Sequence, residues 1–446
     1  MNYPRIMIAA PKSGSGKTTI TCGLLKALKD RGYNPCSFKC GPDYIDPMFH
    51  RNVIGIEAGN LDTFFTEGET TRKIFKAEYV GDIAIIEGVM GLYDGVGGVE
   101  KEGSSYDLAD TLECPIILVV DAKGAGKSIL AEIKGFLDYD EKKLIKGVIL
   151  NKTSTSFANI LKPLIEEELG IKFLGVLESD KDIFLSSRHL GLVLPDEIED
   201  LRQQLEKLAA NISKEIHLDE IIDIAKSASD SFTGLAPWLP IGNVNTIRLA
   251  VARDSAFCFY YKENLEMLKS LGVELVEFSP LKDKRLPENI SGLLLGGGYP
   301  ENYLQELSQN ESMKKSIKEA IKAGLPTLAE CAGFMYLMEE IEAQNGESES
   351  MVGYFNGKAT WQGKLVRFGY VIINSGDFKI KGHEFHYFDT DNNGDDCILC
   401  KPTGNRQYYC IHKNGMSHMG FAHLYYPSSP AFINSFVEAM KKYGGK

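Results

Sequence analysis

The chain has 446 residues, more than one hydrophobic core usually organises, so we expect two globular domains. A formal net charge of −12 argues against nucleic acid as the main partner, because phosphate backbones are bound by clustered Lys and Arg. No apolar run is long enough to cross a bilayer, which argues against membrane insertion. The N-terminus leaves no room for a targeting peptide, and nine scattered cysteines do not suggest a disulfide framework, so we expect a reducing, cytoplasmic location.

The first part of the chain alternates strand and helix patterns. A short apolar run at residues 5–10 precedes a Gly/Ser loop and a helical pattern at residues 18–29. Further strands, bounded by Gly, Asp or Asn, are expected at residues 83–86, 115–120 and 147–150. This alternation predicts a parallel sheet covered by helices. Residues 196–229 lack glycine and carry apolar residues at helical spacing, so we expect helices there that close the first domain.

A break in regular structure separates the two halves. Glycine and proline recur within residues 231–245, which makes this segment the best linker candidate. We therefore expect one domain at residues 1–230 and another at residues 246–446. The second domain repeats the α/β pattern, with strands expected at residues 247–252, 274–278, 292–295 and 326–329.

The loop after the first strand has the sequence of a phosphate-binding loop. Its Gly-Lys-Thr core is typical of a P-loop, in which backbone N–H groups and a helix N-terminus bind phosphates. We expect Lys17 to reach the β- and γ-phosphates of ATP and Thr18 to bind Mg²⁺. Pro11 replaces the usual first glycine, which resembles the deviant P-loop of the dethiobiotin-synthetase and Min/Par-like ATPase group, where an extra lysine, here Lys12, approaches the phosphates. The predicted nucleotide-binding residues of this loop are Lys12, Gly14, Ser15, Gly16, Lys17, Thr18 and Thr19.

Two acidic clusters follow strand candidates, where a magnesium nucleotide needs oxygen ligands. Asp43 and Asp46 lie just after a strand that would end at Gly41 and Pro42. Glu87 ends the apolar strand at residues 83–86, and Asp94 lies in the loop beyond it. We favour Glu87 and Asp43 as functional residues. For Asp46 and Asp94, a helix cap or a turn is an equal alternative.

The second half contains the pattern of a cysteine nucleophile. Cys331 lies between an apolar strand and an apolar helix, which is the arrangement of a nucleophile elbow. At the N-terminus of a helix we expect its thiol pKa to be depressed. Three glycines end an upstream strand, and we expect the backbone N–H groups of Gly297, Gly298 and Ala332 to bind an oxyanion.

These features resemble the class I glutamine amidotransferase domain, in the variant fused to corrinoid amidases, and the match runs from Ala250 to the C-terminus. The resemblance implies a flavodoxin-like α/β fold and makes His423 the base. Common members carry an acid two residues after this histidine, whereas this chain has Tyr425, so the third catalytic group is unassigned. His383 and His386 match a family string and could shape the passage between two active sites, or could belong to a strand. The spacing of four residues loosely resembles that of a zinc site: Cys397, Cys400, Cys410 and His412. A strand is the better interpretation of this segment.

Three strings in the first half resemble those of the cobyrinic acid a,c-diamide synthase family: FKCGPDYIDP, NLDT and EGVMGLYDG. This resemblance implies that Thr18, Asp43 and Glu87 hold Mg²⁺. It also implies that Asp46 and Asp94 lie near the transferring phosphate and the carboxylate of the tetrapyrrole.

Two further site residues come from the same comparison of strings. Arg188, in RHLGL, is a candidate for binding substrate carboxylates, with a surface arginine as the alternative. Asn151 is expected to face the adenine, by analogy with related P-loop enzymes.

The resemblance implies a two-domain α/β enzyme that uses Mg²⁺, ATP and glutamine to convert the a and c carboxylates of cobyrinic acid into amides through acyl phosphates. Its partners would be small molecules, and a homodimer is compatible with the sequence. Hydrogenobyrinic acid and nickel sirohydrochlorin are alternative acceptors for the same chemistry. A Min/Par-like ATPase switch is an alternative of another class, against which the cysteine elbow argues because a switch needs no nucleophile.

Overall fold

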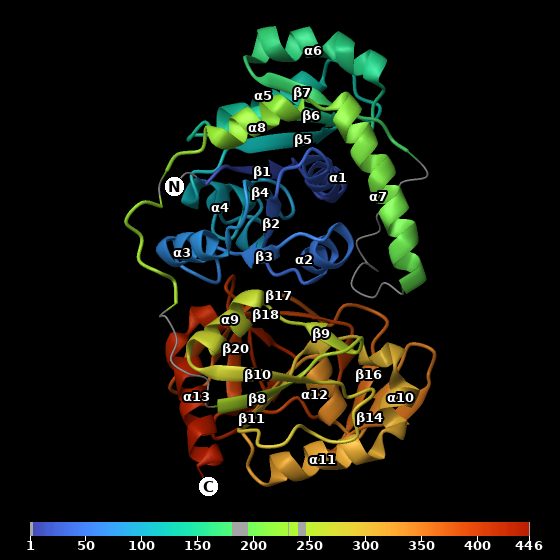
Figure 1. The fold of residues 1–446 in the computed structure, drawn as a ribbon, viewed down its shortest axis with the longest axis vertical. Coiled ribbons are helices and arrows are strands. Elements are labelled where there is room, and N and C mark those ends of the chain that lie inside the picture. Colours follow the sequence, from blue (N-terminus) through green and yellow to red (C-terminus); the bar gives the residue numbers. More distant parts are fainter. Residues whose placement is uncertain (1–2, 181–194, 231, 240–246, 446) are drawn as a thin grey trace. The chain divides into compact units, whose positions relative to one another are not determined.

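The computed structural model describes residues 3–180, 195–230, 232–239 and 247–445. The chain forms two compact units, Met1–Trp238 and Leu239–Lys446 (Figure 1). This division falls within residues 231–245, the range with a linker composition. Each unit has its own sheets and its own buried core.

The first unit is built on a seven-stranded sheet in the order β3-β2-β4-β1-β5-β6-β7, and all neighbouring strands run parallel. Every residue of its central strands β1 and β4 is buried, because helices cover both faces of the sheet. The predicted parallel sheet is therefore confirmed, and β3 and β7 are strands that the sequence patterns missed. The strands are β1 (Arg5–Ala9), β2 (Pro35–Cys40), β3 (Ala58–Leu61), β4 (Ile83–Glu87), β5 (Ile116–Asp121), β6 (Ile145–Asn151) and β7 (Lys172–Leu177).

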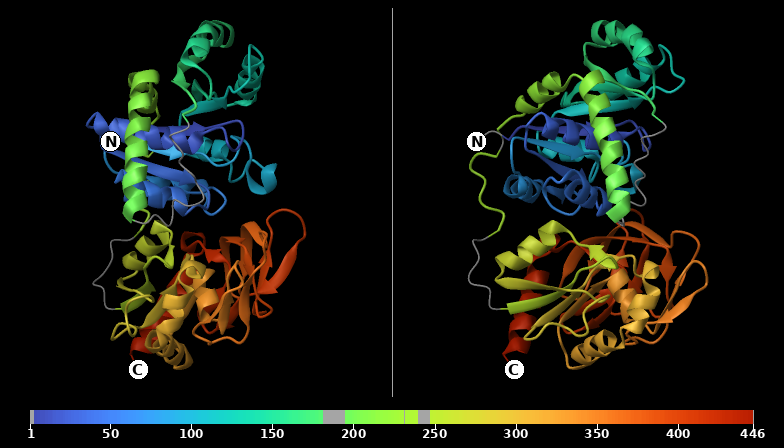
Figure 2. Two further views of the ribbon diagram at one scale, coloured as in Figure 1. Left: turned by 90° about the vertical axis from the view of Figure 1, so that its right-hand side faces the viewer. Right: turned by 45° about the vertical axis from the view of Figure 1, so that its right-hand side comes forward.

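Two groups of helices bury the two faces of this sheet. One face packs against α1 (Lys17–Asp30), α2 (Ile45–Phe49), η1 (His50–Ile54), α7 (Pro195–Glu215) and α8 (Leu218–Lys226). The other packs against α3 (Gly68–Glu78), α4 (Ser105–Thr111), α5 (Ile129–Tyr139) and α6 (Thr155–Leu169), while η2 (Val96–Gly98) is a short turn. Figure 2 shows α7 lying along this unit, where it contacts α1. Gly23 permits that contact, since a Cβ there would lie 2.7 Å from Ile212 Cγ1.

The second unit is centred on a six-stranded sheet in the order β10-β8-β11-β13-β23-β22. Its first five strands are parallel, and in chain order they read 2-1-3-4-5, which is the flavodoxin-like arrangement that we predict. The edge strand β22 is antiparallel to β23. The strands are β8 (Ile247–Ala252), β10 (Val273–Phe278), β11 (Gly292–Leu295), β13 (Thr327–Glu330), β22 (His412–Asn414) and β23 (Ser417–Gly420).

Helices and further strands complete this unit. One face of the central sheet packs against α10 (Leu304–Gln309), α11 (Glu311–Lys322) and α12 (Ala332–Leu337). The other packs against α9 (Lys262–Ser270), α13 (Pro430–Gly444) and an antiparallel sheet, β21-β20-β17-β18-β24. Its strands are β17 (Arg367–Asn374), β18 (Lys379–His386), β20 (Cys397–Cys400), β21 (Gln407–Cys410) and β24 (His423–Leu424).

Smaller elements surround these layers. A four-stranded sheet contains β14 (Glu340–Glu342), β15 (Ser348–Ser350), β16 (Lys358–Trp361) and β19 (Phe388–Asp389). A short pair joins β9 (Phe257–Phe259) to β12 (Gly297–Gly298), and two single turns are η3 (Pro300–Asn302) and η4 (Tyr426–Ser428). The sequence favours a strand over a zinc site where β20 lies, and offers a strand as an alternative at residues 383–386 of β18. The other strands of the antiparallel sheet and the smaller strands were not among the predicted elements.

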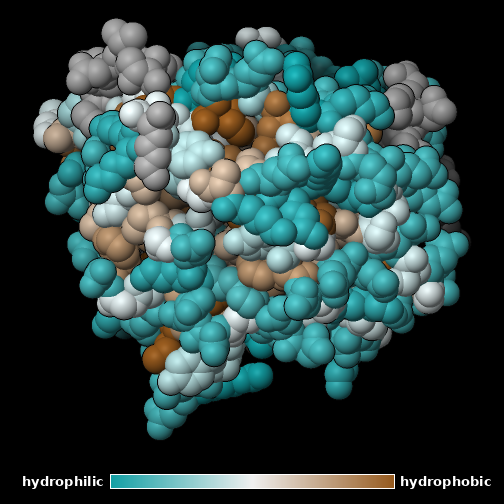
Figure 3. All heavy atoms as spheres, turned by 90° about the horizontal axis from the view of Figure 1, so that it is seen from below, coloured by the Kyte–Doolittle hydropathy of each residue, from teal (hydrophilic) through white to brown (hydrophobic). Residues whose placement is uncertain are grey.

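The surface seen from below in Figure 3 is largely hydrophilic, with hydrophobic residues showing between hydrophilic ones. Helix α11 illustrates the pattern, because Met313, Ile317 and Ile321 are buried while most of its charged residues face outwards. Among the helices of the described ranges, none combines the length and apolar character that a bilayer crossing requires.

Candidate active sites

The first candidate site lies where β1 gives way to α1. Gly14 and Gly16 have φ of 79° and 101°, in the left-handed region that favours glycine, and this lets the loop turn back over the helix N-terminus. Asn151, at the end of β6, donates from Nδ2 to the Ser15 carbonyl oxygen at 2.8 Å. A Cβ on Gly16 would lie 2.0 Å from that Nδ2 atom. The Asn151 side chain therefore holds the predicted phosphate loop in place through the loop's backbone.

The lysines of this loop lie in different environments. Lys17 is buried and donates to the carbonyl oxygen of Met90, in the loop after β4. Burial, together with the neighbouring Lys39, lowers the pKa of Lys17 to about 8. Lys12 is exposed, and its carbonyl oxygen accepts from the Ser15 hydroxyl at 2.9 Å. Thr19 is half-buried in the first turn of α1.

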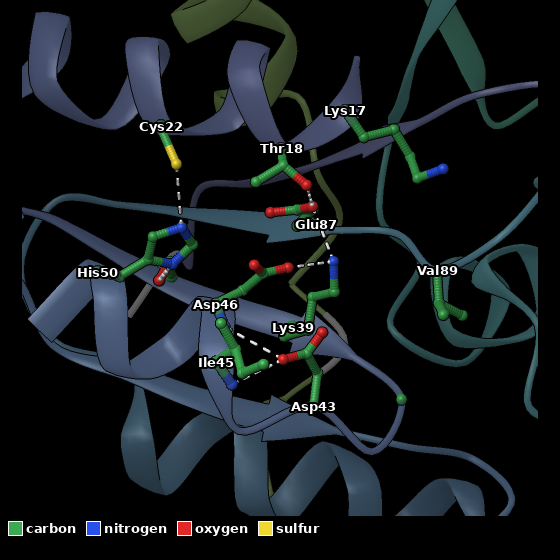
Figure 4. A network of polar contacts seen from close by, with 12 residues as sticks. Lys17, Thr18, Cys22, Lys39, Asp43, Ile45, Asp46, His50, Glu87 and Val89 are labelled. Atoms are coloured by element: carbon green, nitrogen blue, oxygen red, sulfur yellow. Dashed lines mark hydrogen bonds and ion pairs between the residues drawn. The ribbon is translucent and has the colours of Figure 1, made fainter. Parts of the chain in front are cut away.

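A buried polar network faces this loop (Figure 4). The Lys39 Nζ atom lies 2.7 Å from Asp46 Oδ2 and 2.7 Å from Glu87 Oε1. The Thr18 hydroxyl donates to the same Glu87 oxygen at 2.6 Å. Burial raises the pKa of Glu87 to about 7, while Lys39 lowers the pKa of Asp46 despite burial. Lys39 lies in β2 and Glu87 in β4, and these two strands run parallel. Their carboxyl ends therefore bring both side chains beside Thr18.

Asp43 and Asp94 both shape their own loops. Asp43 Oδ1 accepts from the backbone N–H groups of Ile45 and Asp46, at 2.8 and 3.1 Å, and so caps α2. Asp94 Oδ2 accepts from the Gly91 N–H at 2.9 Å and stabilises a turn. The sequence allows a helix cap at Asp46, but Asp43 makes that cap. Asp46 instead forms the buried ion pair with Lys39.

The oxygen donors at this site suit a magnesium ion. Glu87 Oε2 is buried and has no hydrogen-bond partner among the described residues, so it can accept a cation. Thr18 supplies a hydroxyl beside it, and Asp43 lies near Asp46. No group of three or more His, Cys, Asp or Glu in the described ranges is arranged to hold a metal by itself. Mg²⁺ usually keeps several waters and phosphate oxygens, so the fit is to a nucleotide-bound ion and not to an all-protein cage.

The second candidate site lies between β13 and α12. Cys331 has φ 47° and ψ −103°, a strained conformation for a residue with a side chain, and this is the sharp strand-to-helix turn that the sequence predicts. Its N–H donates to the Gly420 carbonyl oxygen at 2.9 Å. Gly333 allows the helix to approach β11, because a Cβ there would lie 2.2 Å from the Leu295 carbonyl oxygen.

The predicted depression of the Cys331 thiol pKa is wrong. Burial, together with the carboxyl groups of Glu301 and Glu330, raises the pKa of Cys331 to about 12. The Ala332 N–H donates to the sulfur and acts in the opposite direction. Because α12 spans only Ala332–Leu337, its N-terminus does not offset this loss of solvation. The thiol is therefore protonated at rest and needs a base.

His423 lies at the same edge of the sheet, three residues after Gly420. It pairs with His383 across β24 and β18, and the two rings stack at 4.8 Å with 15° between their planes. Burial lowers the pKa of His423 to about 3, so the imidazole is neutral at rest. Glu330 Oε2 lies 3.8 Å from His423 Nδ1.

The glycines of the predicted oxyanion site lie beside this histidine. Gly297 and Gly298 form β12, which pairs with β9. A Cβ on Gly297 would lie 2.5 Å from His423 Cε1, and one on Gly298 would lie 2.1 Å from the Ala256 carbonyl oxygen. Both positions therefore need glycine for close approach of the backbone.

The other predicted residues have structural partners. His383 and His386 lie in β18 and are buried more deeply than the half-buried strand alternative implies, and Tyr261 and the Phe388 carbonyl oxygen contact their Nδ1 atoms. Cys397 and Cys400 are three residues apart in β20, so their side chains point to opposite faces of the strand, which opposes a shared zinc ion. Arg188 lies outside the described residues.

Sequence reasoning missed two residues of these sites. Lys39 is a lysine within the buried strand PCSFKC, and that position is the signal that could have identified it. Glu330 directly precedes the nucleophile, but its approach to His423 depends on the pairing of β13 with β23 and could not be read from spacing.

Comparisons with known proteins identify the families of both units. Residues 6–193 match the family described as CobQ/CobB/MinD/ParA nucleotide binding domain, and residues 248–423 match the CobB/CobQ-like glutamine amidotransferase domain. A cobyrinate a,c-diamide synthase of Clostridium tetani is 39% identical over 97% of this chain and 99% of its own length. Another from Clostridium acetobutylicum is 44% identical over 85% of this chain and 86% of its own length.

A solved structure of a glutamine amidotransferase aligns with 44% of this chain and 99% of its own, at 16% identity and a TM-score of 0.32. The two curated relatives share one name and align across both units. The chain therefore belongs to the cobyrinate a,c-diamide synthase family.

Proposed function

We propose that this chain amidates the a and c carboxylates of cobyrinic acid in cobalamin biosynthesis, using ATP and the amide nitrogen of glutamine. The observation that carries this proposal is the presence of two chemical sites in one chain of this family: a phosphate loop facing a buried carboxylate network, and a cysteine elbow whose N–H donates to Gly420, three residues before His423. A reducing cytoplasm suits its nine free cysteines.

The first unit would activate the substrate. A carboxylate is a poor electrophile toward ammonia, so it attacks the γ-phosphate of ATP and forms an acyl phosphate, with ADP as the leaving group. Lys17 would leave the Met90 carbonyl oxygen to contact the phosphates, and Lys12 would approach them from the exposed start of the loop. Mg²⁺, held by Thr18, Asp43 and Glu87, would offset the charge on the phosphoryl group.

Three further residues of the first unit would orient the reactants. Asp46 and Asp94 would face the transferring phosphate and the substrate carboxylate, and Asn151, which holds the phosphate loop through the Ser15 carbonyl oxygen, would face the adenine. Arg188 is our candidate for a second substrate carboxylate.

The second unit would supply ammonia. His423 takes the thiol proton, the Cys331 sulfur attacks the amide carbon of glutamine, and a γ-glutamyl thioester forms as the C–N bond breaks. The proton returns to the departing nitrogen, which leaves as ammonia, and water then releases glutamate. Backbone N–H groups at Gly297, Gly298 and Ala332 would stabilise the oxyanion. Ammonia displaces phosphate from the acyl phosphate and leaves the amide.

Mass spectrometry can identify the acceptor. Cobyrinic acid, hydrogenobyrinic acid and nickel sirohydrochlorin would each be incubated with the protein, ATP, Mg²⁺ and amide-¹⁵N-glutamine. We expect cobyrinic acid to gain two labelled nitrogens. Labelling of one of the other tetrapyrroles in its place would change the acceptor, and ATP hydrolysis with no glutamine consumption would favour a nucleotide-driven switch.

A further inference from the structure

A buried carboxyl group lies directly beside the histidine of the glutaminase site. Glu330 is the last residue of β13 and is 6% exposed. Its Oε2 atom lies 3.8 Å from His423 Nδ1, the distance of an ion pair if the ring is protonated. The backbone fixes this approach, because Glu330 is in register with Gly420 on β23 and the next residue, Cys331, hydrogen-bonds to the Gly420 carbonyl oxygen.

The other groups around His423 have partners of their own. The His383 ring stacks on one face of the imidazole, and its own Nδ1 contacts the Tyr261 hydroxyl. Burial lowers the pKa of His423, and the Glu384 carboxyl group acts in the opposite direction, but Glu384 also lies within 4 Å of Arg367, Lys401 and His386. Among the described residues, Glu330 lies within ion-pair distance of no basic side chain except His423.

A second contact orients this carboxyl group. The Tyr426 hydroxyl donates to Glu330 Oε1 at 3.4 Å, which leaves Oε2 on the side of the histidine. Burial raises the pKa of Glu330 to about 8, so its charge develops in the pH range in which the enzyme can be assayed.

We propose that Glu330 is the positioning residue of the glutaminase site: its carboxylate faces His423 Nδ1 and forms an ion pair with the imidazolium that develops when the thiol is deprotonated. This inference rests on the proposed glutaminase function and supplies the group that Tyr425 cannot provide. With Nδ1 turned to Glu330, Nε2 takes the proton from the Cys331 sulfur and later gives it to the departing amide nitrogen.

The physical need for such a group follows from burial. A neutral imidazole surrounded by protein is a weak base, because the charged form loses its hydration. A carboxylate at Nδ1 restores part of that stabilisation and also selects the tautomer with its lone pair on Nε2. Because Glu330 directly precedes Cys331, its carboxyl group also fixes the position of the His423 ring relative to the strained turn at the nucleophile.

Glu330→Gln tests the proposal in the full chain, because glutamine keeps the shape and an acceptor oxygen but cannot become charged. Glutaminase kcat should fall at least tenfold at pH 9 with the KM for glutamine within twofold of wild type. The difference should narrow toward pH 6.5, where a protonated carboxyl resembles the amide. Glu330→Asp, which retains the charge, should recover part of the kcat at pH 9.

Amidation driven by ammonium chloride is the control, since it needs the first unit but not the cysteine. It should be unchanged in each variant, which would show that the chain is folded. If Glu330→Gln does not fold, Tyr426→Phe replaces it and should lower kcat two- to fivefold. A kcat within twofold of wild type in the folded variant, or a loss of equal size at all pH values, would overturn the inference. Absence of glutaminase activity in the wild-type chain would instead overturn the proposed function.

Discussion

Removing the ammonium group of Lys39 should destabilise the first unit and make its stability depend on Mg²⁺. The Lys39 side chain is 7% exposed and lies 2.7 Å from one oxygen each of Asp46 and Glu87. Lys39→Met keeps a similar apolar length but leaves two buried carboxyl groups facing each other without the cation.

The size of the effect follows from the desolvation of those charges. Removing one partner from a buried ion pair costs about 3–5 kcal/mol. We expect the lower end, about 3 kcal/mol, because the Thr18 hydroxyl still donates to Glu87 and either carboxyl group can take up a proton. For a unit of this size, each kcal/mol lowers the unfolding midpoint by about 2–4 °C, so the midpoint of the first unit should fall by about 6–12 °C.

Scanning calorimetry with and without Mg²⁺ measures both parts of this prediction. Mg²⁺ should recover most of the loss in Lys39→Met, because it can take the place of the ammonium between the carboxylates. Wild type should gain less, because Lys39 already offsets the charge of these carboxylates. Lys26→Met is the matched control, because Lys26 pairs with Asp30 at the surface and such pairs contribute about 0–1 kcal/mol. A loss below about 1 kcal/mol in Lys39→Met, or equal gains from Mg²⁺ in both proteins, would refute the reasoning.

Three other perturbations probe the two sites. Alkylation of Cys331 by iodoacetamide, followed by peptide mass spectrometry, should accelerate continuously from pH 7 to pH 10, because the thiol pKa is raised to about 12; a plateau below pH 8 would indicate a preformed thiolate. Burial lowers the pKa of the His418 ring to about 4, against about 6.5 in the unfolded chain, so wild type should lose up to about 1.4 kcal/mol of stability per pH unit as pH falls from about 6.5 to about 4. In urea unfolding, His418→Asn should reduce this loss. Equal slopes of unfolding free energy against pH in the two proteins would contradict the prediction. Gly16→Ala should weaken ATP binding at least tenfold in calorimetric titration, because the added Cβ would collide with Asn151. Gly14→Ala should weaken ATP binding less, because a Cβ there would meet nothing within 4 Å. Equal losses of affinity would show that the backbone conformation of these glycines, and not the contact with Asn151, sets the effect.

Elements with continuous apolar runs could be predicted closely from the sequence. The expected strands at residues 247–252 and 292–295 coincide with β8 and β11, because a strand buried on both faces needs an unbroken apolar sequence. The antiparallel strand β17 was missed, and only the end of β18, at residues 383–386, was considered as a strand. Their buried residues face the central sheet of the second unit, so their stability depends on a layer that is distant in the sequence.

The site residues divide in the same way. The phosphate loop and the cysteine elbow are local turns, and their glycines and sharp backbone conformations could be recognised from adjacent residues. The partners of Lys39 and Glu330 are brought together by strand pairing, which no local spacing reveals. The thiol pKa of Cys331 was predicted in the wrong direction because burial, a property of the whole unit, outweighs the N-terminus of a six-residue helix.

We expect the phosphate loop to activate a carboxylate as an acyl phosphate before ammonia arrives. Transfer of ¹⁸O measures this directly: cobyrinic acid labelled in its a and c carboxylates is amidated with ATP and glutamine, and the released phosphate is analysed by mass spectrometry. The phosphate should carry one ¹⁸O atom from each amide formed at a fully labelled carboxylate. Amide formation that releases phosphate free of ¹⁸O would contradict it.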